Sequence, residues 1–419
     1  MKTGFSQQFV PGLKTNERYS FILFLIWPFL AFILAIINYS RKESRQIVYL
    51  FLVYYGFTFV IQNDLVDSSR YAMSLKINAQ LPFSEFFRVV GGLYNSDTSV
   101  DIYEPFVSFI VSRFTNNHGV LFGVYTAVFA FFYLGSINLL HDRYRQNPGW
   151  NAITFLAFFV MVIPVTTING VRMYTAAWIF FYAAYHVVME RNAKYLILAL
   201  ASSFVHFSFM SANIVLLIYY FAGNRNLIYL PVTVASFILP GFIAPFLQSM
   251  SRSMGGALQN RVEGYTSENY IYAQQESLAQ SSWFLQISNN LIFYYLILSI
   301  IFIQLRYGSL MKEKSEKNLF SFLLLFLSFV NFGMPIPSFG ERFQALFFLF
   351  ATMYVFLFFL KLPGNRIYLM TLLGIFPMLL YTLINFRLGS ESISAWILAP
   401  GLGSPLLVPV LSVAELLFY

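Results

Sequence analysis

Long apolar segments recur along the whole chain and are separated by short polar linkers. Residues 20–38 and 342–360, for example, reach the roughly 20 apolar residues that a helix needs to cross a bilayer. Apolar segments fall at 20–38, 47–62, 119–140, 151–166, 171–189, 194–221, 226–248, 283–305, 318–334, 342–360 and 366–385. Because lipid offers no partners to open strand edges, the pattern predicts an all-α protein, a polytopic transmembrane helical bundle with about 10–12 spans.

The charges of the linkers orient these segments. Residues 306–317 form the most basic linker, so the positive-inside rule places it in the cytoplasm and 249–282 outside. The basic linker 190–194 also belongs inside, which is impossible if 194–221 crosses only once. We therefore predict that 194–221 turns back, as a re-entrant hairpin or a broken helix pair with His206 near its outer tip.

Two further segments depart from simple spans. Residues 102–114 are too short to cross and are expected to form a partly inserted or interfacial helix, with Asp101 and Glu104 as a capping box. The tail 387–419 is apolar but interrupted by prolines, which makes it a poor helix. We treat 1–419 as a single integral membrane domain in which the outer loops at about 63–118 and 249–282 contribute to a site.

The composition and charge of the chain exclude several classes of function. Only 11% of the residues are charged, against about 25% in soluble domains. The net charge of +8 follows from basic inner linkers, and no basic stripe with interleaved aromatic residues predicts binding of nucleic acid. The chain has no cysteine and its four histidines are scattered, so we expect no metal site and no cofactor.

Candidate site residues gather on the predicted outer face. Arg172 and Arg342 each lie in the first turn of a predicted helix, where free backbone amides and the positive end of the dipole favour an anion. A forked guanidinium at that place suits a diphosphate. The other members of the set are Asp64, Asp67, Arg70, Tyr71, Glu104, Asn169, His206, Arg261 and Glu341.

Several of these residues also have a simpler explanation. Arg172 could extend its guanidinium to lipid head groups, and so could Arg342 unless Glu341 neutralises it. Asp67 and Arg70 have the spacing of a helical ion pair. Glu104 could serve simply as a helix cap, and His206 could be a buried, hydrogen-bonded histidine.

An ordered set of short motifs resembles the EpsG family of bacterial exopolysaccharide polymerases, relatives of the Wzy-type O-antigen polymerases. The motifs are DLVDSSRY (64–71), YEPFVSFIVS (103–112), INGVRMYTAAWIFF (168–181), SSFVHFS (202–208) and GERF (340–343). The resemblance covers about 45–360, and Met173 stands where many relatives are expected to have Gln.

The resemblance implies glycosyl transfer on the outer side of the bacterial cytoplasmic (inner) membrane. Repeat units carried on undecaprenyl diphosphate, a polyprenyl carrier, would serve as donor and acceptor and be joined into an extracellular, capsular or O-antigen polysaccharide. Besides membrane lipid, expected partners are a flippase and a chain-length regulator. Arg172 and Arg342 would hold the leaving diphosphate without a metal, and His206, Glu104 or Asp67 would be the general base.

Three alternatives remain open from the sequence. A ligase that moves a finished glycan from the same carrier needs nearly the same diphosphate site. A metal-dependent glycosyltransferase would call for a closer acidic pair than Asp64 and Asp67. A flippase or transporter would use the same arginines to bind a lipid diphosphate without reaction.

Overall fold

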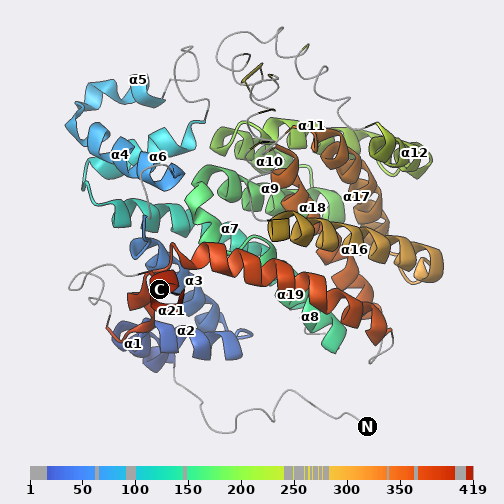
Figure 1. Cartoon of the computed structure of the whole chain (residues 1–419), viewed down its shortest axis with the longest axis horizontal. Helices are drawn as coiled ribbons and strands as arrows, with labels where there is room; N and C mark the ends of the chain where they lie inside the picture. The colour runs from blue at the N-terminus through green and yellow to red at the C-terminus, as the bar shows by residue number, and fades with distance from the viewer. Residues whose placement is uncertain are drawn as a thin grey trace.

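The computed structural model describes residues 17–61, 66–90, 101–144, 149–239, 283–336, 339–362, 367–401 and 412–418, with isolated positions between 249 and 276. Every element named within these ranges is a helix, and the helices pack into one bundle (Figure 1). The predicted all-α polytopic bundle is therefore confirmed.

Within the described residues, 5 helical stretches are long and apolar enough to cross a membrane. They are α7 (His118–Tyr144), α16 (Trp283–Tyr307), α18 (Phe339–Lys361), α19 (Tyr368–Ser390) and a stretch of 41 residues that joins α8 (Trp150–Val162) through η3 (Val165–Gly170) to α9 (Val171–Glu190). The ring of Phe159 packs against Trp178 and Phe181, so the chain turns back between α8 and α9. The number of crossings in the whole chain stays a prediction.

The first apolar segment differs from its prediction as one continuous span. It is divided at Trp27 into α1 (Glu17–Ile26) and α2 (Pro28–Ile37), because Pro28 has no N–H to continue the helical hydrogen bonds. The break is held from the C-terminal side of the chain. The Trp27 indole donates to the Leu398 carbonyl at 2.9 Å, and the Gly401 N–H donates to the Ile26 carbonyl at 2.6 Å.

The segment 194–221 turns back, as predicted. It forms α10 (Tyr195–Val205) and α11 (Phe209–Ala222), and His206 lies in the break between them. Arg191 donates to the Tyr220 carbonyl at 3.0 Å, so the two ends of the pair lie on the same face. The side-chain amide of Asn213 holds α11 to α10 by donating to the Ala199 carbonyl at 2.8 Å.

Charged linkers between the helices, including the predicted cytoplasmic linker 306–317, share one face of the bundle. Arg45, at the start of α3 (Lys42–Phe57), pairs with Asp142 at 2.5 Å. Lys361 pairs with Glu313 at 2.9 Å, just before α17 (Lys314–Gly333). Lys361 lowers the pKa of the Glu313 carboxyl by a hydrogen bond and by its charge, and the charge of Arg143 adds to that effect. The four linkers that hold Arg45, Asp142, Glu313 and Lys361 therefore meet, although they are far apart in sequence.

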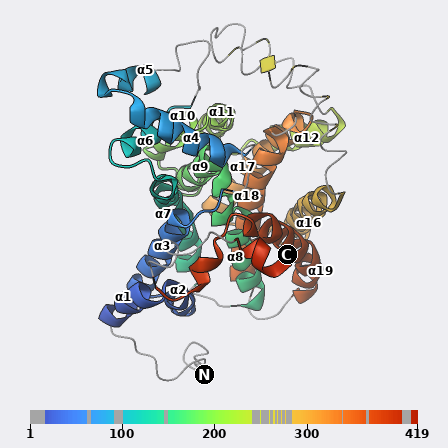
Figure 2. The ribbon, with the colours of Figure 1, turned by 60° about the vertical axis from the view of Figure 1, so that its left-hand side comes forward.

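Helices α4 (Asp67–Gln80), α5 (Phe86–Val90) and α6 (Tyr103–Ser112) gather at the opposite end from α1 and α2 (Figure 2). The short 3-10 helix η1 (Phe83–Glu85) precedes α5. The Asn78 side chain donates to the Ser108 hydroxyl at 3.1 Å, and Arg113 donates to the Leu81 carbonyl at 2.7 Å. The predicted short helix at 102–114 is therefore present and is anchored on α4.

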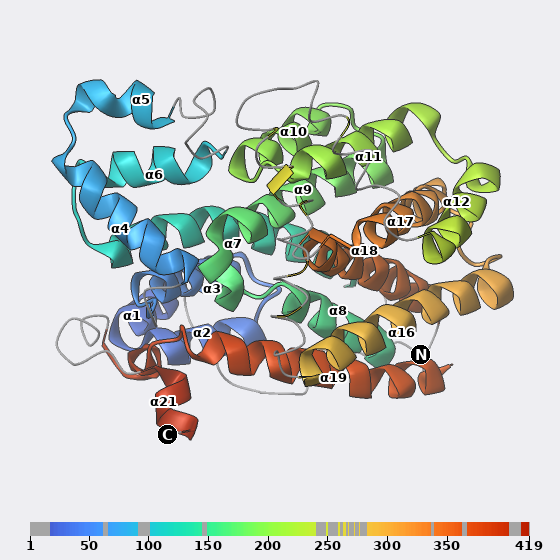
Figure 3. The same ribbon diagram turned by 45° about the horizontal axis from the view of Figure 1, so that its top comes forward.

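Helix α19 extends five residues beyond its predicted end, to Ser390, and lies beside α16 (Figure 3). The chain then turns back through η4 (Ala395–Leu398), and a last helix, α21, covers Val413–Phe418. The Ser392 carbonyl accepts from the Val60 N–H at 3.0 Å, and its hydroxyl bonds the Tyr55 hydroxyl at 3.0 Å. The first part of the tail is thus packed against α3. Helix α12 (Asn226–Ile238) covers the described part of 226–248.

Candidate functional site

A cavity of about 640 Å³ lies where α4, η3, α9, α18 and α19 meet the chain that follows α3. Helices α9 and α18 begin at this cavity and run to the face that holds the basic linkers. The cavity therefore lies toward the opposite, predicted outer face. Seven predicted site residues line it: Asp67, Arg70, Tyr71, Asn169, Arg172, His206 and Arg342. Glu104 and Glu341 are not among its lining residues, and Asp64 and Arg261 lie outside the described residues.

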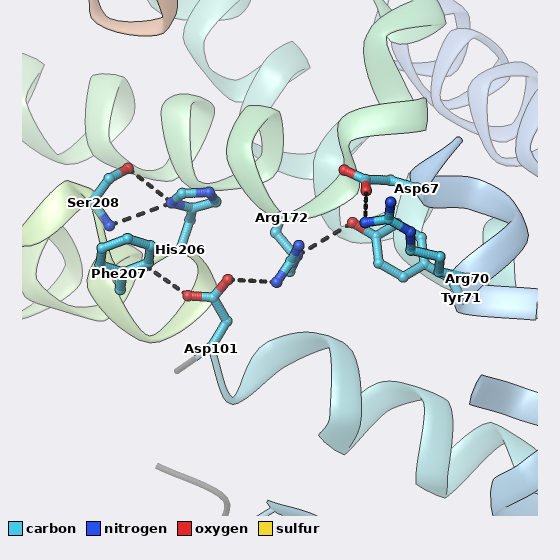
Figure 4. A network of polar contacts seen from close by, with 8 residues as sticks. All are labelled: Asp67, Arg70, Tyr71, Asp101, Arg172, His206, Phe207 and Ser208. Carbon is cyan, nitrogen blue, oxygen red and sulfur yellow. Dashed lines mark hydrogen bonds and ion pairs between the residues drawn. The ribbon is translucent and has the colours of Figure 1, made fainter. Parts of the chain in front are cut away.

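Arg172 is the second residue of α9 and is held from two sides (Figure 4). Its Nη1 donates to Asp101 Oδ2 at 2.9 Å, and its Nε donates to the Tyr71 hydroxyl at 3.2 Å. The Asp101 side chain is only 3% exposed. A buried carboxylate thus compensates the charge of Arg172, and the two bonds fix the plane of the guanidinium while it still lines the cavity.

Asp101 does not cap α6 as expected, because its carboxylate binds elsewhere. The N-cap of α6 is Ile102, which makes no side-chain capping bond. Asp101 Oδ1 instead accepts the Phe207 N–H at 2.8 Å, in the break between α10 and α11. Asp101 therefore joins the start of α9 to that break. Its spacing to Glu104 suggested a local role, whereas its partners are 71 and 106 residues away in the chain.

His206 ends α10 and is buried. Its Nδ1 accepts the Ser208 N–H at 3.3 Å and lies 2.8 Å from the Ser208 hydroxyl. Because a backbone N–H can only donate, Nδ1 is an acceptor, and the neutral ring carries its proton on Nε2. In this tautomer Nε2 is a hydrogen-bond donor. That geometry suits binding of an oxygen better than removal of a proton from a hydroxyl.

Asp67 and Arg70 form the predicted pair within α4, with Arg70 Nη1 3.3 Å from Asp67 Oδ1. Their side chains are 40% and 72% exposed, so water screens the attraction. Asn169 accepts the Ser68 N–H at 3.3 Å and thereby connects η3 to α4. The Asp67 carboxylate therefore stays accessible to a ligand in the cavity.

Glu104 does not line the cavity but lies within electrostatic range of Arg172. Burial raises the pKa of its carboxyl to about 7, against the opposing effects of the Arg172 charge and a hydrogen bond from Ser74. Within the described part of the chain, its Oε1 has no hydrogen-bond partner. A large share of this carboxyl is therefore protonated at neutral pH. The predicted proton-handling groups that line the cavity are Asp67 and His206.

Arg342 is the fourth residue of α18 and is half-buried in the cavity wall. Among the described residues, no carboxylate lies within 4.0 Å of its guanidinium. Glu341 therefore forms no ion pair with it. The nearby Tyr174 feels the charges of both Arg342 and Glu341. Arg342 therefore presents a cation to the cavity without a compensating partner in this part of the protein.

Sequence reasoning missed a set of uncharged residues in the cavity wall. They are Thr166 and Thr167 on η3, Asn385, Leu388 and Gly389 on α19, and Ser392 in the turn that follows. A Cβ on Gly389 would lie 2.5 Å from Thr166 Oγ1, so the two elements meet only because residue 389 has no side chain. Glycine near the end of an apolar helix was the one available signal, and it did not identify a partner.

The sequence model of the EpsG family matches residues 83–397, about three quarters of the chain. No curated protein and no solved structure matches it. The matched range includes Asp101, Arg172, His206 and Arg342, and it extends through the turn that contains Ser392. The motif at 64–71 lies before its start.

Proposed function

The chain belongs to the EpsG family of polysaccharide polymerases, and on that premise we propose that its donor is an oligosaccharide linked to a polyprenyl diphosphate, undecaprenyl diphosphate in bacteria. The acceptor is a hydroxyl of a second lipid-linked repeat unit. Each reaction transfers the growing glycan from one carrier to the other and releases a free polyprenyl diphosphate. The membrane-length apolar helices support a multi-pass membrane protein, which suits a lipid-linked donor.

The observation that carries the proposal is the position of Arg342. A cation in the first turn of a helix is opposed by the helix dipole, whereas an anion there is stabilised. Arg342 nevertheless lines the cavity without an ion pair among the described residues. A diphosphate in the cavity would supply the missing negative charge at the start of α18, where the helix dipole favours an anion.

Arg172 completes the diphosphate site. It also lies in the first turn of its helix, but Asp101 and Tyr71 already fix its orientation. A preorganised guanidinium can receive a phosphate oxygen without paying for its own ordering. The two arginines would therefore have different roles. Arg342 would supply net positive charge, and Arg172 would orient the diphosphate.

The chemistry follows from this arrangement. The acceptor oxygen attacks the anomeric carbon, the bond from that carbon to the diphosphate oxygen breaks, and the acceptor proton passes to a base. Asp67 is the carboxylate in the cavity that suits this role. His206 lines the same cavity and would contact the sugar or the diphosphate there. A single displacement inverts the anomeric carbon, and the arginines supply the charge stabilisation without a metal.

The orientation follows from the basic linkers. By the positive-inside rule their face would be the cytoplasmic one, and the cavity would then face the outside of the cytoplasmic membrane. A flippase must then deliver the lipid-linked units from the inner leaflet. A chain-length regulator is the other partner that we expect.

Reconstitution tests the function. The purified protein in liposomes, given lipid-linked repeat units, should produce glycans with a ladder of lengths on gels, and production should persist in a chelator. Arg342→Ala in the same liposomes is the matched control and should leave the repeat units unchanged. Movement of the units across the bilayer without lengthening would instead identify a transporter, and transfer only to a different acceptor would identify a ligase.

A further inference from the structure

The cavity has two parts with different chemistry. Arg70, Arg172 and Arg342 provide its cations, from α4, α9 and α18. The second part, here called the neutral wall, consists of Thr166, Thr167, Asn385, Leu388, Gly389 and Ser392. The charged residues next to it, Arg387 and Glu391, pair with each other at 2.9 Å and do not line the cavity. The neutral wall therefore offers hydroxyl and amide groups without net charge.

We infer that the neutral wall binds the sugar residue attached to the diphosphate, and that it selects which repeat unit the enzyme accepts. This inference rests on the proposed function, because it assumes a glycan beside a diphosphate. It assigns a role to the end of α19 and the turn after it, which the catalytic chemistry above does not use.

The neutral wall is held rigidly by bonds within the protein. Thr167 donates to the Pro164 carbonyl at 2.7 Å, and the Ser392 hydroxyl donates to the Gly389 carbonyl at 2.8 Å. The close contact of Gly389 with Thr166 joins α19 to η3. A preorganised wall of this kind fixes the orientation of a ligand at low entropic cost.

Two polar groups of the wall are not used for that internal bonding. The Asn385 amide nitrogen donates to the Tyr381 carbonyl at 2.9 Å, which leaves its oxygen as an acceptor beside the cavity. The Thr166 hydroxyl has no hydrogen-bond partner among the described residues, although it is only half-buried. One acceptor and one hydroxyl in fixed positions match the alternating donors and acceptors of a sugar ring.

The alternatives to a sugar fit the wall less well. A second phosphate would require a cation or several free N–H groups, and the wall residues supply neither. A prenyl chain would leave the Thr166 hydroxyl and the Asn385 oxygen without partners, which is unfavourable. Leu388 offers one apolar contact, which suits the C–H face of a sugar ring. A neutral, hydroxyl-rich ligand satisfies all of these groups together.

Binding measured with two probes tests this inference. The probes are undecaprenyl diphosphate without sugar and the lipid-linked glycan that accumulates in cells after deletion of this gene. Thr166→Val keeps the shape that contacts Gly389 but removes the hydroxyl, and Asn385→Leu removes the acceptor. Each should weaken binding of the sugar-bearing probe about threefold to tenfold, as expected for one hydrogen bond, and leave the bare diphosphate unaffected. Thr154→Val, on α8 and away from the cavity, is the matched control and should change neither.

The outcomes separate this inference from the proposed function. Arg342→Ala should weaken both probes. If it does so while Thr166→Val and Asn385→Leu change neither probe, the sugar role of the neutral wall is wrong and the polymerase proposal stands. Equal weakening of both probes by the wall variants would make the wall part of the diphosphate site and would also overturn the inference. If the wild-type protein binds neither probe, the proposed function fails and the inference fails with it.

Discussion

The two ends of α18 hold their charges in opposite ways. At its C-terminal end, Lys361 pairs with Glu313 at 2.9 Å and with the buried Glu316 at 2.6 Å, and the helix dipole favours a cation there. At its N-terminal end, the dipole opposes Arg342, and the described residues offer it no carboxylate. The charge at the basic face is therefore satisfied by the fold, whereas the charge at the cavity is left for a ligand.

Arg172 stands between these two cases. It lines the same cavity as Arg342 but is paired with Asp101, which is itself almost fully buried. An arginine at the start of a helix can therefore have different roles. The pairing of each residue indicates whether its charge supports the fold, the orientation of a site or the binding of an anion.

Replacement of Arg342 should produce the largest effect on function. Arg342→Ala should lower polymer formation by about a hundredfold or more, because the charge that stabilises the leaving diphosphate is lost. Thermal stability should stay near that of the wild type, since no ion pair among the described residues is broken. Polymer ladders from cells and the melting temperature of the purified protein provide the measurements. Normal polymer from an inserted variant would contradict the proposed diphosphate site.

Asp101 should affect stability and function together. Asp101→Asn leaves Arg172 partly buried without its counter-charge, so we expect destabilisation of about 3 kcal/mol or more and at least about tenfold less polymer. The double variant Asp101→Asn with Arg172→Gln removes the uncompensated charge. It should recover part of the stability but none of the activity, as measured by unfolding and by polymer formation. Recovery of activity in the double variant would rule out a role for the oriented guanidinium.

Arg172→Lys tests whether the planar shape of the guanidinium is needed in addition to its charge. A lysine keeps the charge but cannot bond Tyr71, Asp101 and a phosphate with a planar fork. We expect about tenfold less polymer than from the wild type, with nearly normal membrane insertion, checked by gel and by immunoblot. Full activity would show that charge alone is sufficient at this position.

Replacement of Lys361 should lower stability and leave activity unchanged, which is the reverse of the result expected for Arg342. Lys361→Met leaves the buried Glu316 carboxylate without its partner and should lower stability by about 1–3 kcal/mol. The activity of each folded molecule should be unchanged, because Lys361 is remote from the cavity. Melting temperature and polymer formed per amount of folded protein measure the two quantities. A selective loss of activity would break the proposed contrast between the ends of α18.

Glu104 should give a smaller, pH-dependent effect. With a pKa raised from 4.5 to about 7, the folded protein keeps a proton that the unfolded chain releases. Stability should therefore fall as the pH rises from about 4.5 to 7 and then level off, by up to an amount on the order of 3 kcal/mol. Glu104→Gln cannot ionise and should lack this dependence. Unfolding curves across this pH range for both proteins provide the test.

Much of the fold could be predicted because the relevant rules act on each segment separately. The apolar runs predicted helices, and 5 helical stretches of the described residues are long and apolar enough to cross a membrane. The basic linkers predicted that 194–221 turns back. The same rules placed Arg172 and Arg342 in the first turns of helices on one face. They failed at Trp27, where the following proline divides a run of sufficient length into two helices.

The sequence by itself determined that this is a helical membrane protein with arginines at the starts of two helices, because bilayer thickness and charge asymmetry act along the chain. Only the tertiary structure decided that Asp101 binds Arg172 and not its own helix, and that Arg342 has no such partner among the described residues. It also brought Asn385 and Gly389 to the cavity. The physical reason is that these contacts join residues far apart in sequence, so they depend on how the helices pack and not on the pattern within any one of them.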